Sequence, residues 1–131
     1  MTLIVWKREF EIGIPGVDFE HEHLIGLING LYKKLEDHPS TPAISDVLAE
    51  IYAKISSHFA LEEKIMQDRR YDEYAEHKAD HERLLDEIRD IMDSFDKNPA
   101  FAYKGALIER LTPWFTVHFK TKDARFHKAI E

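Results

Sequence analysis

The sequence predicts an all-α protein, an up-down-up-down four-helix bundle preceded by an extended N-terminal arm. Apolar residues recur at steps of three and four through four long segments, as they do on one face of an α-helix. Short connections containing Pro, Asn or Asp separate these segments. The chain has 131 residues, 44% of them apolar, which is enough for one domain with a substantial core. Amphipathic helices joined by short connections pack as antiparallel neighbours.

Composition and charge exclude several classes of protein. The net charge of −7 argues against nucleic acid or an anionic membrane as a partner. The absence of cysteine excludes disulfides, thiolate metal sites and iron–sulfur clusters. No apolar run approaches the length of a membrane span, and no signal-peptide pattern is present. We therefore expect one cytoplasmic domain over residues 1–131, without membrane insertion, and a monomer.

Residues 1–17 predict an arm, and residues 18–131 predict the bundle. Large apolar residues alternate loosely along the arm, namely Trp6, Phe10, Ile12 and Ile14. Gly13, Pro15 and Gly16 punctuate its end. We expect the arm to pack its large side chains along the bundle. The alternative, a short strand, would have no partner strand.

The first helix is expected over residues 19–37 with Asp18 as its N-cap. Its buried stripe is His21, Leu24 or Ile25, Ile28, Tyr32 and Leu35. A turn at residues 38–42 follows, with Thr41 as the expected cap and Pro42 at the first helical position. The second helix is expected over residues 42–67, and its stripe is Ile44, Leu48, Ile51, Ile55, His58, Glu62 and Met66.

The third helix is expected over residues 73–95, capped by Asp72. Its stripe is His77, His81, Leu84, Ile88, Ile91 and Phe95. Asn98 is expected to cap the fourth helix, whose stripe is Leu107 or Ile108, Leu111, Trp114 or Phe115, and His118. Pro113 removes a backbone donor and is expected to kink this helix.

Histidine and carboxylate side chains interrupt these stripes at one end of the predicted bundle. Up-down topology brings together the start of the first helix, the end of the second, the start of the third and the end of the fourth. These four places hold His21, the pair His58 and Glu62, the pair His77 and His81, and His118. Residues four apart share a helix face, and buried ionisable groups must be paired or bound. The sequence therefore predicts a metal site at this end.

Asp123 completes the candidate set under one structural condition. His118 and Asp123 are five residues apart, which a regular helix turns through roughly 140°. Both can face the core only if the helix bends, bulges or ends between them. A short C-terminal helix after Asp123 is compatible with such a break.

Four motifs resemble those of the hemerythrins, specifically the single-domain bacteriohemerythrins. They are the run from Gly13 to His21, His58-x3-Glu62-Glu63-x2-Met66, His77-x3-His81 and Trp114-x3-His118-x4-Asp123. The likeness extends from Trp6 to Asp123. Pro113 is one departure from the pattern of the family.

The resemblance implies a centre of two iron ions joined by an oxo or hydroxo group. It gives one iron the ligands His77, His81 and His118, and it gives the other His21 and His58. Glu62 and Asp123 would bridge both, so the first iron is six-coordinate and the second keeps one free position for dioxygen. Imidazole and carboxylate ligands suit iron in this role. The resemblance also places an apolar wall around the free position, formed by Leu24, Phe59, Trp114 and Phe115.

The remaining acids and histidines near the motifs are assigned to the surface. Glu22, Glu63 and Asp80 lie beside candidate ligands in sequence but point off the stripes, so we expect them to be solvated. We expect the same of the three histidines outside the set, His23, His38 and His127.

The expected function is reversible dioxygen binding for transport, delivery or storage, with an oxygen-consuming enzyme as a possible recipient. The chain is not expected to be an enzyme. The alternatives are a di-iron oxidase or oxygenase, a sensor of oxygen or nitric oxide, an iron store, and a zinc or manganese site. Ferritin-like di-iron sites use a Glu-x-x-His motif from each of two helices, and here only Glu20 and His23 fit that spacing.

Overall fold

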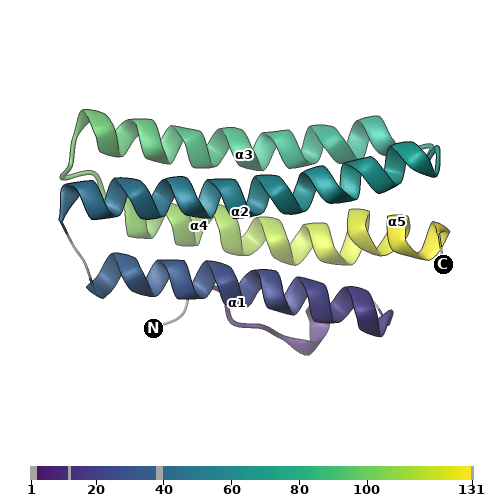
Figure 1. Ribbon diagram of the computed structural model, residues 1–131. Coiled ribbons are helices and arrows are strands. Elements are labelled where there is room, and N and C mark those ends of the chain that lie inside the picture. Colours follow the sequence, from purple (N-terminus) through teal and green to yellow (C-terminus); the bar gives the residue numbers. More distant parts are fainter. Residues whose placement is uncertain (1–2, 12, 38–39, 131) are drawn as a thin grey trace.

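The computed structural model describes residues 3–11, 13–37 and 40–130, and every regular element in these ranges is helical (Figure 1). Ile12 and His38, which the sequence predictions include, lie outside the described residues. The predicted all-α class is confirmed. The elements are η1 (Arg8–Phe10), α1 (Pro15–Asp37), α2 (Thr41–Asp68), α3 (Tyr74–Lys97), α4 (Tyr103–His118), the π-helical segment η2 (Phe119–Asp123) and α5 (Ala124–Ala129).

The four long helices run alternately up and down (Figure 1). Contacts join α1 to α2, α2 to α3, and α3 to α4, as expected for antiparallel neighbours in sequence order. The start of α1, the end of α2, the start of α3 and the end of α4 meet at the end of the bundle where α5 and the C-terminus lie. None of the described helices combines the length and the apolar character that crossing a membrane requires.

The buried face of each helix follows the predicted stripe. The predicted stripe residues of α1, α2 and α3 are buried, apart from His58, whose side chain is 18% exposed. In α4 the buried members are Leu107, Leu111, Phe115 and His118. Burial of these side chains removes apolar surface from water, which drives the helices together. The same stripes carry the ionisable residues into the core at the shared end.

The helix ends differ from prediction at several places. At the start of α3 the N-cap residue is Glu73 rather than the predicted Asp72, and no side chain there accepts a backbone N–H of the first turn. Helix α1 begins at Pro15, four residues early, because proline is compatible with the first turn of a helix. Asp18 then lies inside the helix and accepts the backbone N–H of Gly13 at 3.2 Å. Ser40 rather than Thr41 caps α2, and its hydroxyl accepts the N–H of Ala43 at 3.4 Å.

A further difference is the start of α4, which begins at Tyr103 rather than directly after Asn98. The Asn98 side chain accepts the N–H of Ala100 at 3.1 Å. Asn98 therefore stabilises the turn between α3 and α4 instead of capping a helix, since a short polar side chain readily bonds the backbone two residues on.

The N-terminal arm packs on the bundle as a 3₁₀ turn and extended segments rather than as a strand. Leu3, Ile4 and Phe10 are buried. The backbone of Ile4 forms two hydrogen bonds with the Asn29 side chain of α1, at 2.9 and 2.8 Å. The ring of Phe10 lies 6.0 Å from that of Phe119, so the arm covers the segment that leads into Asp123.

The predicted break between His118 and Asp123 is a π-helical segment. Helix α4 continues through Pro113, and π-type geometry begins after His118. Because π-helices bond residue i to residue i+5, the wider turn lets residues five apart face the same side. His118 and Asp123 are accordingly both buried, and the short helix α5 follows.

Candidate metal site

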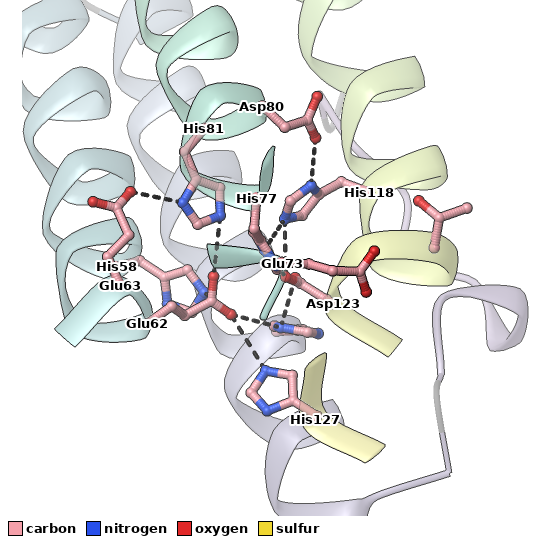
Figure 2. Close-up of polar contacts among 12 residues, drawn as sticks. His58, Glu62, Glu63, Glu73, His77, Asp80, His81, His118, Asp123 and His127 are labelled. Atoms are coloured by element: carbon pink, nitrogen blue, oxygen red, sulfur yellow. Dashed lines mark hydrogen bonds and ion pairs between the residues drawn. The ribbon is translucent and has the colours of Figure 1, made fainter. Parts of the chain in front are cut away.

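The seven predicted ligand residues converge in one cluster at the shared end of the bundle. All are buried except His58, which is partly exposed. Figure 2 shows His58 and Glu62 on α2, His77 and His81 on α3, His118 at the end of α4 and Asp123 at the end of η2 pointing toward one another. His21 approaches from α1, with its Nε2 atom 3.3 Å from Asp123 Oδ2.

Asp123 lies between two groups of imidazoles. Its Oδ1 atom is 2.9 Å from the Nε2 atoms of both His77 and His118, and those two nitrogens are 3.1 Å apart. Its Oδ2 atom faces His21 instead. The two oxygens of the Asp123 carboxylate therefore face imidazoles on opposite sides of the cluster.

Glu62 repeats this arrangement from α2. Its Oε1 atom is 3.3 Å from His81 Nε2. Its Oε2 atom is 3.7 Å from His58 Nε2 and 3.8 Å from His21 Nε2. Each carboxylate thus separates a first histidine set, His77, His81 and His118, from a second histidine set, His21 and His58.

Several polar atoms at the centre lack hydrogen-bond partners. Among the described residues these include the Nε2 atoms of His21, His58 and His81, together with Glu62 Oε1. Unpaired polar atoms in a protein interior are costly. A metal cation would satisfy them, because each offers a lone pair toward the cluster centre. Glu62, Asp123 and the first histidine set have ligand atoms that lie within 4.8 Å of one another, so these residues fit a metal ion.

Two carboxylates predicted to be solvated instead contact the outer nitrogens of the first histidine set. Asp80 is only 8% exposed, and its Oδ2 atom accepts the Nδ1–H of His118 at 2.7 Å. Glu63 Oε2 accepts the Nδ1–H of His81 at 2.9 Å. Both expectations of solvation were wrong, because neighbouring helices approach these flanks of the stripes. Such contacts fix the imidazole tautomer and leave Nε2 free for a metal.

The cluster shifts the pKa values of its own members. Burial opposes the charge of His118, but Asp123 and Asp80 beside it raise the pKa of His118 to about 9. Burial and nearby Glu62 act to raise the pKa of Asp123, but His118 and His77 lower it to about 2. Burial lowers the pKa of His58. Without a metal, a proton on His118 compensates the Asp123 carboxylate, and a cation would take the place of that proton.

Aromatic rings cover the imidazoles. Phe59 stacks on His81 with ring centroids 3.8 Å apart, and Trp114 stacks on His118 at 4.2 Å. Phe119 stacks on His21 at 4.2 Å, a role that the sequence reasoning missed. Its position directly after His118 was the available signal.

The other two predicted wall residues lie beside these rings. Phe115 is fully buried against Trp114 and Phe119. Leu24 is buried and borders a surface pocket beside His58, together with Phe19, Leu27 and Leu61.

The two described histidines outside the predicted ligand set, His23 and His127, differ in exposure. His23 is exposed, as expected, and so are Glu20 and Glu22. His127 was expected at the surface, but its side chain is only 11% exposed and its Nε2 atom is 3.3 Å from Glu62 Oε2. The prediction for His127 was wrong because α5 turns the residue into the cluster. Its spacing of four from Asp123 was the signal that could have placed it there.

Fold and site together define a class, a four-helix-bundle protein with a buried, histidine-rich cluster suited to metal. A family model described as the hemerythrin HHE cation binding domain matches residues 13–130. The chain belongs to the hemerythrin family, as its motifs predicted. Family membership and the buried cluster together indicate oxygen binding at a non-haem di-iron site.

Similar proteins carry hemerythrin names. A bacteriohemerythrin of Stenotrophomonas maltophilia is 27% identical over 131 residues, covering 100% of this chain and 84% of its own length. A bacteriohemerythrin of Clostridium acetobutylicum is 24% identical, covering 95% of this chain and 98% of its own length. A myohemerythrin of Theromyzon tessulatum is 26% identical, with 92% and 88% covered.

Proposed function

We propose that this chain binds dioxygen reversibly, as a carrier or store, at two iron ions held by the predicted ligands. The first histidine set would hold one iron and the second histidine set the other. Glu62 and Asp123 would bridge the two. The observation that carries this proposal is that each carboxylate turns one oxygen toward each histidine set.

The residues around the cluster suit binding rather than turnover. When bound, the iron pair supplies the electrons that dioxygen takes up and returns. Phe59, Trp114 and Phe119 cover imidazoles and exclude water from the cluster. Asp80 and Glu63 hold two imidazoles in the tautomer that a metal requires. Their fixed positions favour a rigid, apolar site in which a small ligand stays shielded from solvent.

The second histidine set offers the more open approach for a small molecule. His58 is the one predicted ligand that is not buried, and the pocket beside it is lined mainly by apolar side chains. The first histidine set contributes three imidazoles and the second two. We therefore assign exogenous ligands to the second iron, with delivery to an oxygen-consuming enzyme as the proposed use.

The decisive measurement is an absorption spectrum of iron-loaded protein under anaerobic conditions, then in air, then again under vacuum. We expect two irons per chain and a spectral change in air that vacuum reverses. The oxidised protein should bind one azide per chain. An oxidase or oxygenase would instead consume electrons with each cycle, so recovery that requires added reductant would refute the carrier proposal.

A further inference from the structure

His127 brings a sixth imidazole to the cluster. It lies on α5, four residues after Asp123, and Figure 2 shows its ring directed at Glu62. Its Nε2 atom is 3.3 Å from Glu62 Oε2. This is closer than the 3.7 Å and 3.8 Å that separate the same oxygen from His58 and His21. By proximity to Glu62, His127 is at least as well placed as the second histidine set.

The ring geometry of His127 matches that of His58. The centroids of His21 and His58 are 5.9 Å apart with an interplanar angle of 69°. Those of His21 and His127 are also 5.9 Å apart, with an angle of 68°. His58 and His127 therefore lie at the same distance from His21 and at nearly the same interplanar angle to it. The first histidine set likewise has three imidazoles around its shared carboxylate oxygens.

The distances suit donors of one metal ion. Two donor atoms bound at about 2.1 Å and at right angles lie about 3 Å apart. His21, Glu62 and His127 offer ligand atoms within 4.8 Å of one another, and all three belong to one group that could hold a metal. Small movements would bring them to one ion.

Helix α5 positions His127 beside the cluster from outside the four bundle helices. Phe126 is fully buried and contacts the ring of Tyr71 at 5.0 Å, which anchors the helix. The helix has only six residues, Ala124–Ala129, and follows the four bundle helices. His127 therefore lies outside the four bundle helices, with a side chain that is 11% exposed.

We propose that His127 is an exchangeable third imidazole ligand of the second iron, which an incoming small ligand displaces. This inference rests on the proposed function. Three imidazoles, two carboxylate oxygens and one bridge fill six positions, so the second iron has no permanently free one. Exogenous binding then takes two steps: the His127–metal bond breaks, and the new ligand takes its place.

The test is the rate of azide binding to the oxidised, iron-loaded protein as azide concentration rises. In wild type the rate should level off, because release of His127 becomes limiting. In His127→Ala the rate should rise in proportion to azide, and binding should be tighter. A wild-type rate proportional to azide, or a variant that levels off at the same rate, would overturn the proposal.

His127→Gln separates coordination from hydrogen bonding. Glutamine keeps an N–H donor for Glu62 but is a poor iron ligand. We expect it to behave as His127→Ala does. Wild-type behaviour in His127→Gln would show that His127 only positions Glu62, and the ligand assignment would fall.

A control variant and a measurement of iron content separate the role of His127 from the di-iron proposal itself. Lys128→Arg changes an exposed side chain next to His127 on the same helix and should retain wild-type azide kinetics. Iron content must be two per chain in wild type. A lower content would refute the di-iron proposal and His127 coordination together. A content of two with a rate proportional to azide would refute only the role of His127.

Discussion

In two imidazoles of this site, one ring nitrogen bonds an outer carboxylate and the other faces the centre of the cluster. In His118 the Nδ1–H is held by Asp80 at 2.7 Å, while Nε2 faces Asp123 at 2.9 Å. In His81 the Nδ1–H is held by Glu63, while Nε2 faces Glu62. The outer carboxylates thus direct the lone pairs inward. A histidine without that support would rotate or change tautomer more readily.

We expect Asp80→Asn to weaken metal retention by about 10- to 100-fold, because a neutral amide supports His118 less well than a carboxylate. Competition between the loaded protein and a chelator measures this. Asp86→Asn is the matched control, since the Asp86 side chain on the same helix is 70% exposed. Equal retention in both variants would contradict the proposed orienting role of Asp80.

Substitution of a proposed ligand should lower iron content directly. We expect His77→Ala and Glu62→Ala to hold clearly fewer than two irons per chain, because each removes a donor from the cluster. His23→Ala should retain two, since His23 is exposed. Metal analysis of the purified proteins decides the matter, and equal losses in all three variants would refute the ligand assignment.

At the scale of elements, the π-helical segment η2 and the N-terminal arm work together. The segment η2 turns Asp123 to the same side as His118 and places Phe119 on the ring of His21. The arm then covers Phe119 with Phe10 and Trp6, whose ring centroids lie 6.0 and 6.2 Å away. An irregular helical turn is thereby held by packing from a segment more than 100 residues away in sequence.

Truncation of the arm's buried ring should affect both stability and metal. We expect Phe10→Ala to lower the free energy of unfolding by about 3–5 kcal/mol, the usual cost of emptying a buried phenylalanine site. It should also speed metal release, because Phe119 and His21 lose support. Urea denaturation and chelator kinetics measure the two effects. Val5→Ala, at a 60% exposed position of the arm, should change stability by less than about 0.5 kcal/mol.

At the scale of the whole molecule, folding and metal binding are coupled. The bundle brings five imidazoles and two carboxylates to one end, and several of their polar atoms have no hydrogen-bond partner. Burial of the hydrophobic stripes that assemble the bundle therefore offsets the free-energy cost of burying those unpaired polar atoms. A bound cation would remove that cost in the folded state only.

Removal of metal should lower the melting temperature. A ligand present at about 1,000 times its Kd stabilises a fold by about 4 kcal/mol, which shifts melting by roughly 10 °C or more in a domain of this size. Calorimetry of chelated and iron-loaded protein measures the shift. Identical melting temperatures would mean that the metal does not bind at the buried cluster.

The sequence by itself determined the helices, their buried faces and the residues that converge. Helical periodicity determines the direction in which a side chain points from the helix axis. Short connections make consecutive helices antiparallel neighbours. These two facts suffice to bring His21, Glu62, His81 and His118 to one end. The condition on Asp123 also followed from angle alone, because five residues exceed one regular helical turn by roughly 140°.

Only the tertiary structure decided the roles of Asp80, Glu63, Phe119 and His127. The first two lie one residue away from a predicted ligand, and periodicity directs them to the flank of a stripe. Whether a flank meets water or a neighbouring helix depends on how closely two helices approach. For Phe119 and His127 the deciding feature is the path of the chain through η2 and into α5. That path depends on packing against the arm and α1. The spacing of His127 from Asp123 indicates a shared helix face, but it does not by itself place that face at the cluster.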